Sequence, residues 1–247
     1  MMSKAIFIEK PDNSKIHALF SEPDNKNAIP NDKRTLIIMC HNFPGNCDGT
    51  ESILTYLETT ALRKGLFSMR FDFSHCGNSD GEEKDFTLDS AITDLKTIVA
   101  WSKKQKFQHI GLFTEGLGSF ISIMVGDQYI DFNVMVYPFI NIDEAYSPLN
   151  IDESQQDLCN KFLETLPDYD IEESLENFKK PSLIFYGTKD TNCSSFHLKI
   201  LRDTLGSRRI DITSIKNGSF GLLGTKSRKA VNVNLGVFLE KYAHCYS

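Results

Sequence analysis

Six short apolar runs follow one another along most of this chain, and helix-like segments separate them. The runs are residues 35–41, 66–73, 109–113, 133–139, 182–187 and 208–215, and turn residues flank them. Because most of these runs are apolar along nearly their whole length, they predict strands that are buried on both faces. Buried strands that alternate with helices indicate an α/β fold, with a mostly parallel central sheet and helices on both faces.

Segments outside this pattern complete the expected fold. Residues 4–10 and 15–23 predict two opening strands, which a turn at residues 11–13 connects. Residues 85–106 and 231–242 predict amphipathic helices, because their apolar side chains recur at helical spacing. No repeat or linker divides the chain, and 247 residues can bury a substantial core. We therefore expect a single domain over residues 1–247.

The composition argues against several classes of partner. The chain has 27 basic and 33 acidic residues, and no long basic run, so nucleic acid is not an expected partner. The longest apolar runs, such as residues 36–40, are too short to span a bilayer, and the opening residues lack the apolar core of a signal peptide. We therefore expect a cytoplasmic protein with no membrane partner, whose six cysteines are free thiols.

Two segments carry a family resemblance. The sequence "CHNFPGNCDG" at residues 40–49 resembles the HGFPG oxyanion loop of the α/β-hydrolases. The sequence "RFDFSHCGNSDGEEKDFTLDSAITDL" at residues 70–95 resembles the DFRGxGxSxG segment of the same superfamily. The branch that it resembles most is the serine aminopeptidase-like and feruloyl (cinnamoyl) esterase-like branch. The resemblance implies an α/β-hydrolase fold in which residues 141–180 form a small helical cap.

The resemblance also locates the nucleophile elbow, G-x-S-x-G, at residues 114–118. Thr114 and Gly118 then take the flanking positions and Gly116 takes the serine position, where it offers no hydroxyl. Two other hydroxyls are alternatives: Thr114, if the register shifts, and Ser119, which lies further along the helix. We predict a sharp turn at Gly116, with positive φ, between a strand at 109–113 and a helix that starts near Leu117.

The other two triad positions give a mixed result. Asp190, in "LIFYGTKD", resembles the acid of the triad, although an aspartate after a buried strand is equally typical of a turn or a helix cap. The histidine position aligns best with Phe220, and next with Ser219. None of the six histidines, which are His17, His41, His75, His109, His197 and His244, lies in that loop. The resemblance thus implies a vestigial triad, whose members should meet at one edge of the sheet.

Backbone groups of the site depend less on side-chain identity. The resemblance places the oxyanion-hole donors at the N–H groups of Phe43 and Leu117. Asn42 replaces a glycine of the family pattern, and asparagine tolerates positive φ, so we expect the loop to keep its shape. His41 is expected to be a structural residue that is hydrogen-bonded under this loop.

A metal site is the competing chemistry at the same strand ends. The candidate ligands are Cys40, His41, Cys47, His75 and Cys76. They form no C-x-x-C or H-x-x-x-H pair, and buried cysteine commonly serves as a small apolar residue. We therefore predict no metal and no cofactor, and we interpret the acidic residues 80–85 as a solvated loop.

These observations favour a non-catalytic protein, a pseudoenzyme, over an enzyme. It would bind a small acyl or ester-like ligand, or a protein partner, in a pocket under the cap. The alternative is an active esterase, lipase or aminopeptidase-like hydrolase that uses Glu115, Asp190 or a water in a non-standard way. Metal-dependent and purely structural roles are further alternatives. If the site is otherwise intact, Gly116→Ser together with Phe220→His should restore more ester hydrolysis than either change alone.

Overall fold

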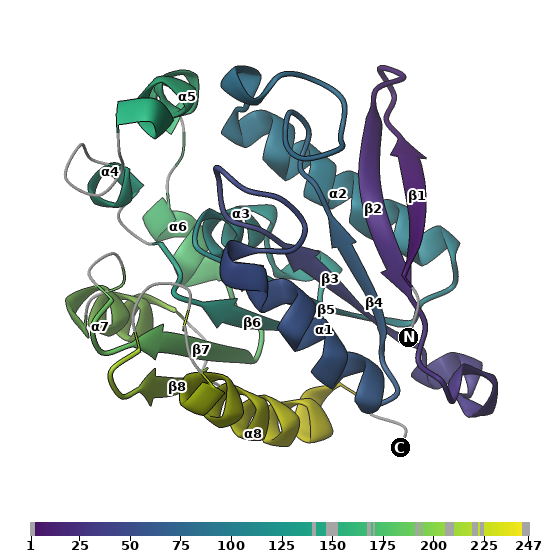
Figure 1. The fold of residues 1–247 in the computed structure, drawn as a ribbon. Helices are drawn as coiled ribbons and strands as arrows, with labels where there is room; N and C mark the ends of the chain where they lie inside the picture. The colour runs from purple at the N-terminus through teal and green to yellow at the C-terminus, as the bar shows by residue number, and fades with distance from the viewer. Residues whose placement is uncertain are drawn as a thin grey trace.

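A twisted sheet of eight strands forms the centre of the molecule (Figure 1). The structure is a computed structural model, and it describes residues 3–139, 142–146, 153–166, 169, 171–190, 193, 195–205, 210–218, 222 and 225–243. The strands are β1 (Lys4–Glu9), β2 (Lys15–Ser21), β3 (Thr35–Cys40), β4 (Phe67–Phe71), β5 (His109–Glu115), β6 (Phe132–Val136), β7 (Ser182–Gly187) and β8 (Ile210–Ile215).

The strand order is β1-β2-β4-β3-β5-β6-β7-β8. β2 pairs with β1 and with β4 in antiparallel fashion, and every other neighbouring pair is parallel. In the middle of the sheet, Ile38 lies opposite Met69 on one side and Leu112 on the other. The mostly parallel sheet that the sequence predicted is therefore confirmed, and the carboxyl ends of its parallel strands meet at one edge.

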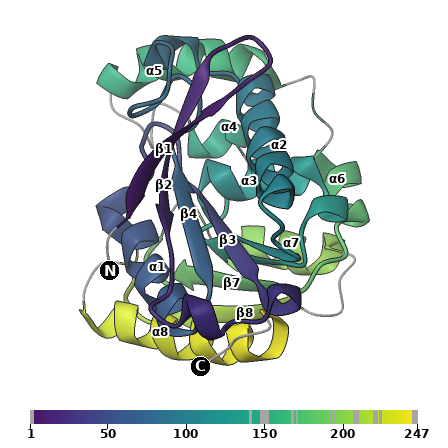
Figure 2. The same ribbon diagram turned by 90° about the vertical axis from the view of Figure 1, so that its right-hand side faces the viewer.

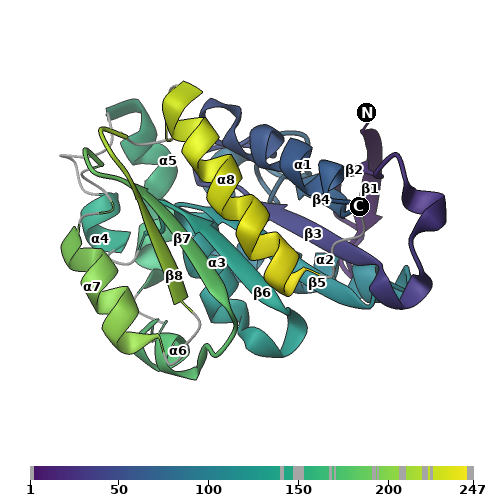
Figure 3. The same ribbon diagram turned by 90° about the horizontal axis from the view of Figure 1, so that it is seen from below.

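Helices cover both faces of this sheet. They are α1 (Ile53–Arg63), α2 (Leu88–Lys104), α3 (Leu117–Val125), α4 (Ile142–Ala145), α5 (Glu153–Glu164), α6 (Ile171–Asn177), α7 (Ser195–Thr204) and α8 (Thr225–Tyr242). Short 3-10 helices are η1 (Lys26–Ala28), η2 (Asn31–Lys33), η3 (Thr50–Ser52), η4 (Glu83–Asp85) and η5 (Asp127–Tyr129). Figures 2 and 3 show α1 and α8 on one face, and α2, α3 and α6 on the other.

The core follows from the apolar runs. All residues of β3, β4 and β6 are buried, as expected for strands that are covered on both sides. The predicted strand at 133–139 is shorter in the structure, because Tyr137 has a φ of +39° and leaves the extended conformation. The predicted helix at 85–106 begins later, at Leu88, because Thr87 caps it: its side chain accepts the N–H of Ser90.

The crossover between β6 and β7 contains α4, α5 and α6, within the range that the sequence assigned to a cap. Parts of residues 141–180 lie outside the described residues. α5 packs against η4, whereas α6 packs against α3 and α7 on the face of the sheet. Residues 142–146 and 153–166 are thus the described part of the crossover that lies near the carboxyl edge, and the cap remains a prediction.

No helix among the described residues has both the length and the apolar character that crossing a membrane requires.

Candidate functional site

A sharp turn at Gly116 joins β5 to α3. Gly116 has a φ of +46° and a ψ of −118°, and α3 begins at the next residue. The end of β6 and the segment after it hold this turn, since the N–H of Gly116 donates to the carbonyl of Val136 and the carbonyl of Gly116 accepts the N–H of Phe139. The predicted strand, turn and helix are confirmed, and so is the positive φ. Glycine adopts this conformation without the strain that a Cβ atom would add.

The flanking glycine of the predicted elbow also has a clear steric role. A Cβ atom on Gly118 would lie 2.6 Å from the carbonyl oxygen of Cys40 and 2.8 Å from that of His41. α3 therefore approaches the end of β3 closely enough to exclude a side chain at this position. This crowding explains why the position holds glycine.

Asn42 fills the space beside Gly116. Its Oδ1 accepts the N–H of Leu117 at 2.9 Å. A Cβ atom built on Gly116 would lie 2.4 Å from that same oxygen and 2.7 Å from the Asn42 Cγ. A side chain at position 116 and the Asn42 amide therefore cannot occupy their present places together.

The backbone of Asn42 does not have the positive φ on which the loop prediction was based, and the shape of the loop stays a prediction. Asn42 is not among the residues of positive φ, so the loop does not use the tolerance of asparagine for that conformation. The side chain explains the residue better, because its amide oxygen satisfies an N–H at the start of α3. The pattern "HN" in place of "HG" gave no signal of this contact.

Glu115, the residue before the turn, organises the loop that follows β3. Its Oε1 accepts the N–H groups of Asn42 and Thr50, each at 3.0 Å, and its Oε2 accepts the hydroxyl of Tyr137. The carboxyl group is buried, and burial raises its pKa although these hydrogen bonds act in the opposite direction. Sequence reasoning missed this structural role, although a carboxylate at the end of an apolar strand was a visible signal.

His41 is a structural residue, as predicted. Its Nε2 accepts the N–H of Phe73 at 3.0 Å, so the proton of the neutral ring is on Nδ1, which lies 2.5 Å from the carbonyl oxygen of Asn42. The ring is fully buried, and burial lowers its pKa. Both nitrogens are occupied by the backbone of neighbouring loops, which leaves His41 no free nitrogen to act as a base.

The two alternative hydroxyls point into the core. Thr114 Oγ1 and Ser119 Oγ lie 3.0 Å apart, and both side chains are buried. Thr114 Oγ1 also lies 3.4 Å from Asn133 Oδ1 and 3.3 Å from the carbonyl oxygen of Val134. These partners are a hydroxyl, an amide and a carbonyl, none of which can remove a proton as a general base does.

Asp190 follows β7 and lies at the carboxyl edge of the sheet, as expected from the parallel strands. Its side chain is 7% exposed, and its Oδ1 accepts the N–H of Cys193 at 3.2 Å. That bond, three residues along the chain, fits the turn or cap interpretation. Its role as a triad acid remains a prediction. Phe220 and Ser219 lie outside the described residues.

Aromatic side chains cover the loop that carries Asn42. The rings of Phe43 and Phe86 stack with centroids 3.9 Å apart, and Phe162 of α5 contacts both. Tyr146 contacts Phe162, and its hydroxyl donates to the carbonyl of Phe43 at 2.5 Å. We call Phe43, Phe86, Tyr146 and Phe162 the aromatic cover. All four side chains are buried.

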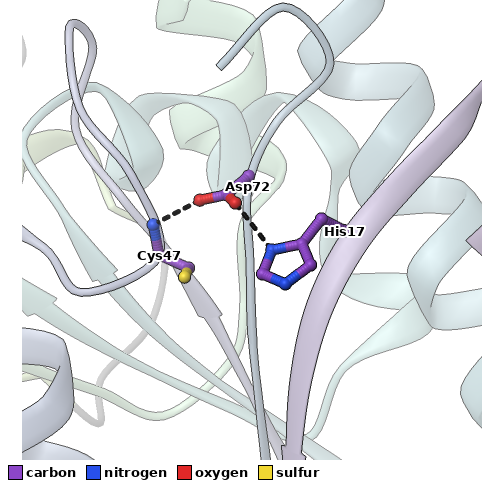
Figure 4. A group of neighbouring side chains, drawn as sticks. All are labelled: His17, Cys47 and Asp72. Carbon is purple, nitrogen blue, oxygen red and sulfur yellow. Dashed lines mark hydrogen bonds and ion pairs between the residues drawn. The ribbon is translucent and has the colours of Figure 1, made fainter. Parts of the chain in front are cut away.

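Three possible metal ligands lie together in a different place, which Figure 4 shows. They are His17, Cys47 and Asp72, and their ligand atoms lie within 4.8 Å of one another. Of the five residues considered from sequence, Cys47 alone belongs to this group. The N–H of Cys47 donates to the Asp72 carboxylate at 2.6 Å, and burial raises the pKa of the Cys47 thiol to about 12.

Hydrogen bonds already engage the carboxylate of this group. Asp72 accepts from Cys47, from the N–H of Asn78 at 3.0 Å and from His17 Nδ1 at 2.7 Å. Burial alone would raise the pKa of Asp72, but these donors hold it below its ordinary value. Asp72 thus links the loops of Cys47 and Asn78 to β2 through these hydrogen bonds, which is a structural role. The absence of a metal stays a prediction.

Comparison with known proteins places the chain in a family. The sequence model of a family described as acyl transferase matches residues 3–168. An acyl transferase of Photobacterium leiognathi is 27% identical over 130 residues, which are 52% of this chain and 39% of that protein. An uncharacterized 31.7 kDa protein from the traX-finO intergenic region of Escherichia coli is 31% identical over 91 residues, 36% of this chain and 31% of that protein. The matches span well under half the length of these relatives.

Solved structures share the fold at low identity. Est1E from Butyrivibrio proteoclasticus, with bound ferulic acid, has a TM-score of 0.81 and 19% identity, and the match covers 96% of this chain and 98% of that chain. The esterase Pf2001 from Pyrococcus furiosus has a TM-score of 0.78 and 19% identity, with coverages of 98% and 91%. A lidless α/β serine hydrolase from Xanthomonas campestris has a TM-score of 0.72 and 14% identity, with coverages of 98% and 95%. This chain therefore belongs to the acyl transferase family, and its fold is that of the α/β-hydrolases.

Proposed function

We propose that this chain is a non-catalytic member of the acyl transferase family which binds a small acyl or ester-like ligand beside the turn at Gly116. The observation that carries the proposal is steric. Residue 116 has no side chain, and the Asn42 amide oxygen lies only 2.4 Å from the place that the first atom of a side chain would take. The missing side chain at 116 and the Asn42 amide beside it both support the absence of a nucleophile at this turn.

The chemistry of acyl transfer supports the same conclusion. A hydroxyl attacks a carbonyl at a useful rate only when a neighbouring base takes its proton. Thr114 and Ser119, the nearest hydroxyls along the chain, are buried and bonded to each other, and His41 binds backbone groups through both ring nitrogens. Glu115 is engaged by Asn42, Thr50 and Tyr137.

The aromatic cover supports an acyl ligand. Sites for small apolar molecules are lined mainly by apolar and aromatic side chains with a few polar groups among them. Phe86 and Phe162 supply the apolar surface here, and the Tyr146 hydroxyl is the polar group. The family description and the ferulic acid bound to Est1E suggest a ligand with an acyl group. Because the cover is closed in this structure, the ligand enters by displacing these side chains.

Two measurements test the proposal. We expect no turnover of p-nitrophenyl acetate above that of a heat-denatured control, and saturable turnover would overturn the non-catalytic assignment. In an amide chemical-shift titration with sodium octanoate, we expect saturable shifts at Gly116, Leu117 and Tyr146. Val233 and Val237 are exposed residues of α8 and serve as internal controls that should not shift. Unchanged spectra would contradict binding of an acyl ligand, and a protein partner would then be the alternative that binds at this site.

A further inference from the structure

We propose that the Asn42 side chain is a built-in occupant of the oxyanion position, where its amide oxygen takes the hydrogen bond that a ligand carbonyl or carboxylate would otherwise receive. The inference deepens the proposed function, and it rests on that function's placement of Gly116 at the nucleophile position. It implies that a ligand oxygen must compete with Asn42 for the N–H of Leu117.

The Leu117 N–H is a donor of the kind that receives an anion or a polarised carbonyl. It is the first N–H of α3, where the helix offers no carbonyl partner and carries partial positive charge. Asn42 Oδ1 accepts it at 2.9 Å. An amide oxygen has the same geometry and a similar partial charge to an ester carbonyl oxygen, so it is a chemical stand-in for the carbonyl of a ligand.

Neighbouring groups hold Asn42 in this place. Its own N–H donates to Glu115 Oε1 at 3.0 Å, which fixes the backbone on the far side of the loop. Tyr146 Oη lies 3.5 Å from Asn42 Oδ1 while its hydroxyl donates to the carbonyl of Phe43. Asn42 is 8% exposed. Glu115 therefore holds the backbone of Asn42, while Leu117 and Tyr146 hold its amide oxygen.

The identities of residues 42 and 116 depend on each other. A Cβ atom on residue 116 would lie 2.4 Å from Asn42 Oδ1, 2.7 Å from its Cγ and 3.2 Å from its Cβ. The two contacts below 3.0 Å are with the end of the Asn42 side chain, so a side chain at 116 would force this end to turn away and to give up its hydrogen bond with Leu117. The amide at 42 thus keeps its present place only with glycine at 116, and a side chain at 116 displaces it.

A double-mutant cycle tests this dependence. The variants are Gly116→Ala, Asn42→Gly and the double variant, and Asn46→Gly is the control, because Asn46 is an exposed asparagine of the same loop. We expect Gly116→Ala to lower Tm by about 8 °C in the wild-type background but by about 3 °C with glycine at 42, where only the positive φ still costs stability. The Asn46→Gly background should leave the loss near 8 °C. Equal losses in all backgrounds would overturn the proposal.

Chemical rescue tests the claim that the amide stands in for a ligand. Acetamide reproduces the asparagine side chain, a carbon that carries a primary amide. Acetate has a carboxylate in place of that amide. We expect either compound, in large excess, to shift the Leu117 amide proton saturably in Asn42→Gly and not in wild type or Asn46→Gly. If neither compound acts on Asn42→Gly, or if both act equally on wild type, the Asn42 side chain does not withhold a ligand position and the proposal is wrong.

These outcomes separate this inference from the proposed function. Catalytic turnover by the wild-type chain would contradict the proposed function, yet it would leave the coupling between residues 42 and 116 unchanged. Loss of that coupling would contradict the present inference, and it would not by itself produce turnover.

Discussion

Glu115 connects the end of β5 with both ends of the loop that carries Asn42. Because burial raises its pKa, the folded protein keeps the Glu115 proton at pH values where the unfolded chain, with an ordinary pKa of 4.5, has lost it. Unfolding then releases a proton, and the free energy of unfolding falls as pH rises from 4.5 through the raised pKa. Stability from this residue is thus present at low pH and lost at higher pH.

Replacing Glu115 by glutamine should remove that dependence. We expect urea unfolding of Glu115→Gln to show a smaller loss of stability between pH 4.5 and 8 than wild type, because glutamine keeps an oxygen for the Asn42 and Thr50 N–H groups but does not ionise. Glu115→Ala should cost about 3 kcal/mol, since those N–H groups lose their acceptor. Glu82→Gln, an exposed control, should follow the wild-type curve. A Glu115→Gln curve parallel to wild type would contradict the assignment.

Restoring hydrolysis requires a change at position 42 as well as in the triad. The sequence alone suggested Gly116→Ser with Phe220→His, but the new serine would meet the Asn42 amide. We expect the triple variant, with Asn42→Gly added, to hydrolyse p-nitrophenyl acetate at least about tenfold faster than that double variant, because the Leu117 N–H becomes available to the oxyanion. Equal rates in the two variants, at matched folded concentration, would refute this explanation.

Among the elements, α2 has a start that its sequence specifies. Thr87 and Ser90 exchange side-chain to backbone hydrogen bonds in a capping box. We expect Thr87→Ala to lower the free energy of unfolding by about 1 kcal/mol, as loss of an N-cap usually does. Thr97→Ala, at a half-buried position within the same helix, should change it by less than about 0.5 kcal/mol, because the Thr97 hydroxyl bonds only the carbonyl of Thr93 in an exposed hydrogen bond. Denaturant unfolding of both variants checks this, and equal effects would show that the cap contributes nothing.

Local patterns predicted most of the elements, because strands and helices bury side chains at their own periods. The turn at Gly116 was predictable for the same reason: strand, glycine and helix follow one another directly in sequence. The end of β6 was missed because Tyr137, the residue after the strand, has a positive φ, and its hydroxyl donates to Glu115 at the end of β5, a contact that no local pattern reveals. The hydrogen bond from the Leu117 N–H to Asn42 spans 75 residues, and that from the Tyr146 hydroxyl to Phe43 spans 103, so no local pattern revealed them.

Over the whole molecule, the parallel sheet determines where a site can form, because it brings the ends of β3, β5, β6 and β7 to one edge. Another long-range contact connects the end of β1 to α2: the Lys10 ammonium forms an ion pair with the buried Asp94 carboxylate at 2.8 Å. The shared fold with Est1E and other esterases does not by itself assign an activity. Activity depends on the side chains at this edge, where Gly116 and Asn42 occupy the centre.

The central claim is that this edge carries no activated nucleophile. Intact-mass spectrometry after incubation with a serine-directed fluorophosphonate tests it most directly, with a heat-denatured sample as the control and an active serine esterase in a parallel tube to verify the reagent. We expect the mass of the native protein to remain unchanged while the esterase gains one adduct. A single stoichiometric adduct on the native protein, absent from the denatured sample, would contradict the claim.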